Sequence, residues 1–208
     1  MNLTRLTPQF LKPKARVLLR ATELRSWHKR NFSSPVPQSV KWAVLARYGE
    51  LTETWVETGT YQGETTAFLA QTAKKVYTVE PSTELAKNAR KRLRGFHNVT
   101  ILEGKSEDLL SEIIERVDGP LSFWLDAHYS GGTTFKGTAG TPIREELALI
   151  QKHILRLDRL TVLIDDMHSF EPSDPMFADY PTRGWLVDWA NSNKLNWTME
   201  HGIFVAWK

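Results

Sequence analysis

Acidic side chains stand at the ends of four short runs of β-branched and aromatic residues. These acids are Glu57, Glu80, Asp126 and the adjacent pair Asp165 and Asp166. Burying a carboxylate that has no partner costs free energy, so acids that recur at strand ends indicate a binding or catalytic site.

Three of these acids have the chemistry of a metal site. Asp126, Asp165 and Asp166 supply hard oxygen ligands, which suit Mg²⁺, Mn²⁺ or Ca²⁺. Without a cation the three carboxylates would repel one another and raise one another's pKa. The alternative is that Asp165 and Asp166 cap the next segment while Asp126 orders a loop.

Residues 57–66, with the sequence ETGTYQGETT, predict a glycine turn between a strand and a helix. Gly59 and Gly63 let the backbone turn tightly and come close to a ligand. The start of the helix then offers free N–H groups to a polar or anionic group.

A nucleoside pocket is predicted beside this turn. Glu80 lies about twenty residues after the turn, where a carboxylate accepts hydrogen bonds from ribose hydroxyls. Ser106 and Glu107 follow the third predicted strand, beside the expected position of the base. The alternatives are a solvated strand end for Glu80 and an ordinary helix N-cap for Ser106 and Glu107.

The elements that must position these residues alternate along the chain. Strands are predicted over residues 54–57, 76–80, 99–102, 122–126, 160–165, 196–201 and 203–208, and helices over 14–30, 38–48, 64–73, 84–93, 106–116 and 142–157. Alternating strands and helices predict an α/β fold with a doubly wound, mostly parallel seven-stranded sheet. The last two strands flank Gly202 and predict an antiparallel C-terminal hairpin. Ligands of such sheets bind outside the carboxyl ends of the strands.

Composition and charge predict a single globular domain with an N-terminal extension. The chain has 208 residues, of which 41% are hydrophobic and 25% charged. Residues 1–50 carry ten Lys or Arg against two acids, and they predict a basic helical extension. Such an arm could attract nucleic acid, although a solvated helix face explains the charge as well.

Several classes of protein are excluded or disfavoured. The chain has no cysteine, which excludes disulfides, thiolate metal sites and cysteine nucleophiles. No apolar run approaches the ~18 residues of a membrane span, and we expect a cytoplasmic protein. Homo-oligomerisation is left open.

The glycine turn resembles the first motif of class I S-adenosylmethionine-dependent methyltransferases. Glu57-x-Gly59-x-Tyr61-x-Gly63-x-Thr65 is similar to the form of the motif in catechol-type O-methyltransferases. The resemblance covers about residues 53–208 and implies that residues 51–208 bind S-adenosylmethionine as methyl donor. The implied donor-binding residues are Glu57, Gly59, Thr60, Tyr61, Gly63, Thr65, Glu80, Ser106, Glu107 and Asp126.

The carboxylate cluster extends the resemblance to metal-dependent O-methyltransferases of the catechol, caffeoyl-CoA and macrocin types. These enzymes place an Asp after strand four and an Asp-Asp or Asp-Asn pair after strand five. The resemblance therefore implies that Asp126, Asp165 and Asp166 hold Mg²⁺ or another divalent cation.

The expected reaction is an in-line transfer of a methyl group to a hydroxyl oxygen of a small molecule or glycan. His128, two residues beyond Asp126, is the candidate general base, and His168 is the fallback. Tyr129 stands where the catechol-type enzymes have a lysine, which argues against a catechol acceptor. Residues 130–140 and 170–185 are predicted to be loops over the acceptor.

Three other functions remain open. One is a metal-independent methyltransferase of the same fold that acts on nitrogen or nucleic acid. Another is a non-catalytic nucleoside-binding module, and the third is a sugar-nucleotide transferase that uses residues 126–128 as a metal motif.

Overall fold

A seven-stranded sheet forms the centre of the computed structural model, which describes residues 13–126, 141–171 and 173–208. The strands are β1 (Thr54–Thr58), β2 (Lys75–Glu80), β3 (Val99–Glu103), β4 (Leu121–Leu125), β5 (Leu160–Ile164), β6 (Asn196–Glu200) and β7 (Ile203–Trp207). Their order is β3-β2-β1-β4-β5-β7-β6. All seven predicted strands are confirmed to within one residue at each end.

The first five strands are parallel, and β7 pairs antiparallel with both β5 and β6. The predicted α/β sheet with an antiparallel C-terminal hairpin is therefore confirmed. The strand order reverses between β1 and β4, because β1 leads outward to β2 and β3 while β4 begins the other half of the sheet. Sheets of this kind bind ligands at the carboxyl ends of their strands beside this reversal.

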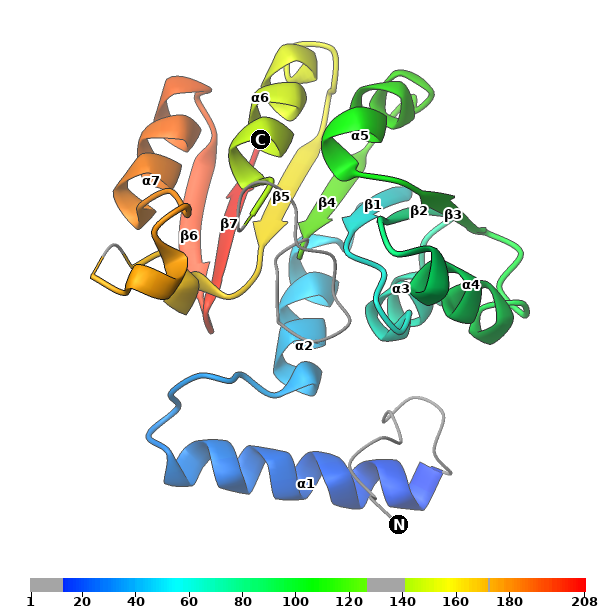
Figure 1. Ribbon diagram of the computed structural model, residues 1–208, viewed down its shortest axis with the longest axis vertical. Helices are drawn as coiled ribbons and strands as arrows, with labels where there is room; N and C mark the ends of the chain where they lie inside the picture. The colour runs from blue at the N-terminus through cyan, green and yellow to red at the C-terminus, as the bar shows by residue number, and fades with distance from the viewer. Residues whose placement is uncertain (1–12, 127–140, 172) are drawn as a thin grey trace.

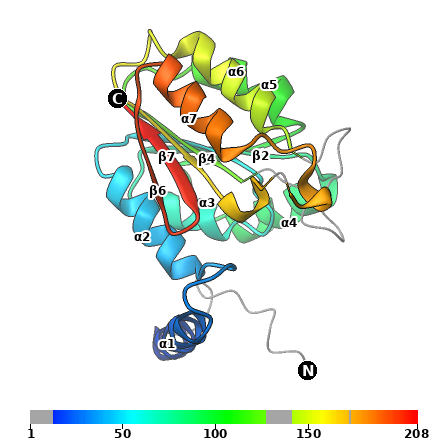
Figure 2. The ribbon, with the colours of Figure 1, turned by 90° about the vertical axis from the view of Figure 1, so that its left-hand side faces the viewer.

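Two layers of helices cover the sheet (Figures 1 and 2). Helices α5, α6 and α7 lie on one face, and α2, α3 and α4 lie on the other. Their bounds are α2 (Gln38–Tyr48), α3 (Glu64–Leu69), α4 (Thr83–Arg92), α5 (Ser106–Glu115), α6 (Ile143–His153) and α7 (Arg183–Ser192). All five residues of β1 are buried, as expected for a central strand covered on both faces.

Helix α2 belongs to the core, although it falls inside the predicted N-terminal extension. Trp42, Val44 and Leu45 of α2 are buried in the same cluster as Trp55 of β1 and Leu69 of α3. The side chain of Trp42 also stacks on Phe68, with 5.1 Å between ring centroids. Residue 50 is therefore not a packing boundary in this fold.

Helix α1 (Pro13–Lys29) lies apart from both helix layers, beyond α2 (Figure 1). Its buried Trp27 makes edge-on ring contacts with Phe32 and with His201 in the turn between β6 and β7. Within the described residues, no helix is long and apolar enough to cross a membrane.

The connection predicted over residues 170–185 is wrong only at its last three residues, because α7 begins at Arg183. Thr182 caps this helix, since its Oγ1 accepts a hydrogen bond from the N–H of Trp185 at 3.1 Å. Leu186, Trp189 and Ala190 are buried against the sheet and stabilise the helix. The sequence pattern did not predict this helix, because Gly184 in its first turn has a low helix propensity.

Candidate active site

The glycine turn after β1 has the backbone geometry that its glycines allow. Gly59, Tyr61 and Gly63 all have positive φ angles, of 87°, 46° and 75°. Gly63 is the N-cap of α3 in the left-handed conformation. The N–H of Gly59 donates to the carbonyl of Val79 at 3.0 Å, which ties the turn to the end of β2. The turn is thus held beside the ends of β1 and β2.

Glu57 lies in the protein interior below this turn. Its Oε2 accepts hydrogen bonds from the hydroxyls of Thr66 at 2.5 Å and Thr78 at 2.6 Å. Burial raises its pKa to about 7, and the two hydroxyl donors oppose that rise. Thr78 also bonds the hydroxyl of Thr60, at 2.6 Å. Through these hydrogen bonds Glu57 stabilises the turn from the protein interior. Its predicted contact with the donor stays a prediction.

Glu80 is fixed at the end of β2 by two backbone donors. The N–H of Tyr61 donates to its Oε2 at 2.8 Å, and the N–H of Ser82 donates to its Oε1 at 2.9 Å. Burial raises the pKa of Glu80, although both hydrogen bonds lower it. Each oxygen has a second lone pair, so the carboxylate can still accept bonds from a ribose.

The start of α5 meets a second buried carboxylate, which the sequence pattern did not predict. Ser106 is the first residue of α5, is buried, and hydrogen-bonds the carboxylate of Glu146 on α6. Burial raises the pKa of Glu146 to about 7. Within the described residues, its Oε1 has no hydrogen-bond partner. Glu107 follows Ser106 at the edge of this site, and its predicted contact with the donor stays a prediction.

Asp126, Asp165 and Asp166 come together as the sequence predicted. One carboxylate oxygen from each lies within 4.8 Å of those of the other two. Strand pairing explains this: the N–H of Asp126 bonds the carbonyl of Thr58, and the N–H of Asp165 bonds that of Leu125, both at 3.1 Å. Asp166 takes a left-handed φ of 52°, a conformation that is uncommon outside glycine.

A lysine from α2 binds this carboxylate cluster. The Nζ of Lys41 lies 2.5 Å from Oδ2 of Asp165 and 3.0 Å from Oδ1 of Asp166. Burial by itself would lower the pKa of Lys41, but the carboxylates of Asp165, Asp166 and Asp126 outweigh it and raise that pKa. Burial and the neighbouring Asp166 raise the pKa of Asp165, and Lys41 opposes that rise. Lys41 is therefore a charged ammonium.

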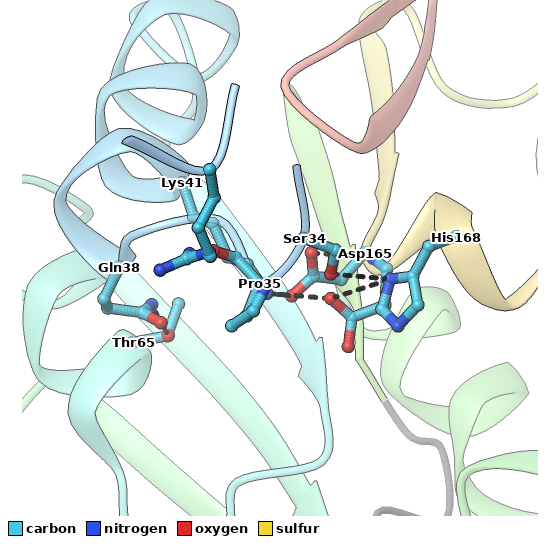
Figure 3. A network of polar contacts seen from close by, with 9 residues as sticks. Ser34, Pro35, Gln38, Lys41, Thr65, Asp165 and His168 are labelled. Carbon is cyan, nitrogen blue, oxygen red and sulfur yellow. Dashed lines mark hydrogen bonds and ion pairs between the residues drawn. The ribbon is translucent and has the colours of Figure 1, made fainter. Parts of the chain in front are cut away.

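Two further contacts join the N-terminal segment to the site (Figure 3). A hydrogen bond of 3.2 Å joins the hydroxyl of Ser34 to Nδ1 of His168. The Nε2 of Gln38 donates to the hydroxyl of Thr65 in α3 at 3.0 Å. Thr65, predicted to bind the donor, thus contacts the first residue of α2.

An aromatic cluster of Phe170, Phe177 and Tyr180 packs beside His168. The ring of His168 packs edge-on against Phe177, and Tyr180 packs against both Phe177 and Phe170. Burial, followed by the charges of Asp166 and Asp126, raises the pKa of Tyr180, so its hydroxyl stays neutral beside the carboxylates. His128, the candidate base, and the predicted loop 130–140 lie outside the described residues.

The sequence carried no local signal for Lys41 or Glu146. Lys41 is one of ten basic residues in the first fifty, and only its contact with Asp165, 124 positions away, distinguishes it. Glu146 follows another glutamate at the start of a helix, where acids are common.

Comparisons with known proteins identify the fold. The chain matches no protein-family model and no curated protein. Among solved structures it is similar to a proposed caffeoyl-CoA O-methyltransferase from Staphylococcus aureus, with a TM-score of 0.54, 15% identity and coverage of 94% of this chain and 98% of that one. It is similar to a proposed rRNA methylase from Clostridium thermocellum, with a TM-score of 0.54, 14% identity and coverage of 84% and 97%.

A third similar structure is a proposed methyltransferase from Streptococcus mutans, solved with S-adenosylhomocysteine. Its TM-score is 0.50 and its identity 15%, over 82% of this chain and 96% of that one. At such identities the likeness shows a shared fold, the Rossmann-like fold of S-adenosylmethionine-dependent methyltransferases. Proteins that share this fold differ in function, which depends on the residues of the site.

Proposed function

We propose that this protein transfers a methyl group from S-adenosylmethionine to a hydroxyl oxygen. One observation carries the proposal: the glycine turn lies between Glu80 at the end of β2 and the carboxylate cluster at the ends of β4 and β5. A nucleoside site and a polar acceptor site thus share one edge of the sheet, on the two sides of the strand reversal.

The donor half of the proposal assigns the nucleoside to the ends of β1, β2 and β3. Glu80 is held by two backbone donors in one orientation, and its oxygens accept the ribose hydroxyls. Gly59 and Gly63 let the turn approach the donor, and Ser106 and Glu107 lie beside the base. The positively charged sulfonium then points toward Asp126, whose carboxylate favours it electrostatically.

The transfer itself is an in-line displacement. The acceptor oxygen attacks the methyl carbon, the carbon–sulfur bond breaks, and neutral S-adenosylhomocysteine leaves with the electron pair. The hydroxyl proton passes to a base, for which His128 stays the prediction and His168 the fallback. The site's part is to align the two reactants, because a fixed geometry removes much of the entropic cost of bringing them together.

The carboxylate cluster has the donor chemistry of a divalent-ion site, but another cation already lies beside it. Three carboxylates with oxygens within 4.8 Å are hard ligands of the right type. The ammonium of Lys41, however, already binds Asp165 and Asp166. No step of the proposed reaction therefore passes through a metal ion, and metal binding at Asp126, Asp165 and Asp166 stays a prediction.

The acceptor side favours a small molecule or glycan with a ring. Phe177 and Tyr180 offer aromatic surfaces next to the carboxylate cluster, and such surfaces stack on planar or sugar rings. The similar Staphylococcus aureus structure is described as a proposed caffeoyl-CoA O-methyltransferase, and the Clostridium thermocellum structure with the same TM-score as a proposed rRNA methylase. The choice of oxygen as the acceptor atom therefore rests on the groups in the site.

The decisive experiment is a calorimetric titration of S-adenosylmethionine into the protein. We expect one-to-one binding in the micromolar range. Replacing Glu80 by Ala should weaken binding by ~1.5–3 kcal/mol, the range for hydrogen bonds to a charged group. Glu84→Ala, an exposed acid on the adjacent helix α4, is the matched control and should bind normally. If wild type releases no heat while folded, the proposal fails.

A second candidate function, methylation of nucleic acid, is favoured by the position of α1. This helix lies apart from the sheet layers, and Arg25 and Lys29 on it are exposed. A nucleic-acid acceptor would bind with a strong dependence on salt concentration, because basic side chains release counterions from phosphates. A neutral small acceptor would show almost no such dependence.

A further inference from the structure

The segment 34–41 is part of the candidate active site, although it precedes every strand. Ser34 contacts His168, Gln38 contacts Thr65 at the start of α3, and Lys41 contacts the carboxylate cluster (Figure 3). These partners come from both halves of the sheet. The segment therefore joins the donor side of the site to the acceptor side.

Lys41 makes the strongest of these contacts. Its side chain is 13% exposed and that of Asp165 only 2%, so water does little to screen the pair. The ammonium donates to Oδ2 of Asp165 and to Oδ1 of Asp166, so it uses one oxygen of each carboxylate. The second oxygen of Asp165 accepts the N–H of Asp166 at 2.8 Å.

This arrangement has a direct consequence for metal ions. A divalent ion bound to the same carboxylates would lie within a few ångströms of the ammonium, and the two positive charges would repel each other. An ion could displace Lys41 only by leaving the ammonium of a largely buried side chain without its partners, which is unfavourable.

We propose that Lys41 is the resident cation of the cluster formed by Asp126, Asp165 and Asp166, and that it keeps divalent ions out of it. As a positioning residue it holds Asp165 and Asp166 together just after β5 and supplies the positive charge that a divalent ion would bring. Its significance for methyl transfer rests on the proposed function, but its effect on metal binding does not.

The test is a titration of Mn²⁺ alone into the full-length protein, followed by electron paramagnetic resonance of the free ion. We expect wild type to bind Mn²⁺ weakly, with a dissociation constant near millimolar or above. Lys41→Met keeps the apolar stem and removes the charge, and we expect it to bind one Mn²⁺ at least tenfold more tightly. Adding Asp165→Asn to this variant should abolish the new site.

Lys41→Arg is the conservative control, which keeps a positive charge and should exclude Mn²⁺ as wild type does. Micromolar binding of Mn²⁺ by wild type would overturn the proposal. This measurement does not depend on whether any variant folds. Folded Lys41→Met protein that binds no better than wild type would overturn it too. Neither measurement uses S-adenosylmethionine, so failure here is distinct from failure of the methyltransferase proposal.

Discussion

Two glutamates, Glu57 and Glu146, are almost completely buried, and burial raises the pKa of each to about 7. In the unfolded chain each carboxyl loses its proton near the ordinary glutamate pKa of 4.5. The native state therefore binds more protons than the unfolded state between these two values. By linkage, the free energy of unfolding falls as pH rises across that window.

We predict that Glu57→Gln makes the free energy of unfolding less dependent on pH in this window. Wild type should lose stability between about pH 5 and pH 7, by up to about 3 kcal/mol from Glu57. The Gln amide keeps an oxygen that accepts bonds from Thr66 and Thr78 but does not titrate. Urea unfolding at pH 5, 6, 7 and 8 measures the slope. Glu115→Gln, an exposed acid, should leave the slope unchanged. A Glu57→Gln variant with the wild-type slope would show that Glu57 is ionised in the fold.

At the scale of single elements, the glycine turn and α3 depend on one residue. Gly63 is the N-cap of α3 at a φ of 75°, and a Cβ placed there would lie 2.9 Å from Cδ1 of Leu93. The side chain of Leu93 can shift to relieve that contact. The left-handed backbone cannot be relieved without moving the turn, so it dominates the cost.

Gly63→Ala should therefore lower the free energy of unfolding by about 1–2 kcal/mol, the cost of left-handed backbone for a residue with a Cβ. Gly95→Ala is the matched control, because a Cβ there meets no atom within 4 Å and its φ is not in the left-handed region. Denaturant unfolding of both variants makes the comparison. Equal stability of the two variants would mean that the turn does not need its left-handed glycine.

At the scale of the whole molecule, the position of α2 gives the N-terminal residues two roles, one in the core and one in the candidate site. The helix closes the core on the face shared with α3, and the same helix brings Lys41 to the carboxylates. Packing and site are thus coupled, since a helix that did not pack could not hold a buried ammonium in place. Helix α1, with most of its described side chains exposed, has no comparable part in the core.

Trp42→Ala should destabilise the whole protein by about 3–5 kcal/mol, as expected for removing a large aromatic side chain from a core. Trp42 is 3% exposed and stacks on Phe68. Leu155→Ala, at a residue 98% exposed, should change stability by less than about 0.5 kcal/mol. If Trp42→Ala leaves the midpoint of thermal unfolding almost unchanged, α2 is an extension that the core does not need.

The sequence by itself determined the sheet and the residues at its carboxyl edge. Strands such as 76–80 and 160–165 are short apolar runs that end in acids, and this information is local. Parallel strands place their carboxyl ends on one edge, so the convergence of Asp126 with Asp165 and Asp166 followed from the fold class. Helix α7 was not predicted, because its buried residues are few and its first turn contains Gly184.

Only the tertiary structure decided which cation meets these carboxylates. Lys41 and Asp165 are 124 positions apart, and no period of 2 or 3.6 residues relates them. Their contact depends on how α2 packs against the sheet through Trp42 and Leu45. Periodicity shows which face of a helix is buried, whereas the partner of one polar side chain at its end is set by three-dimensional packing.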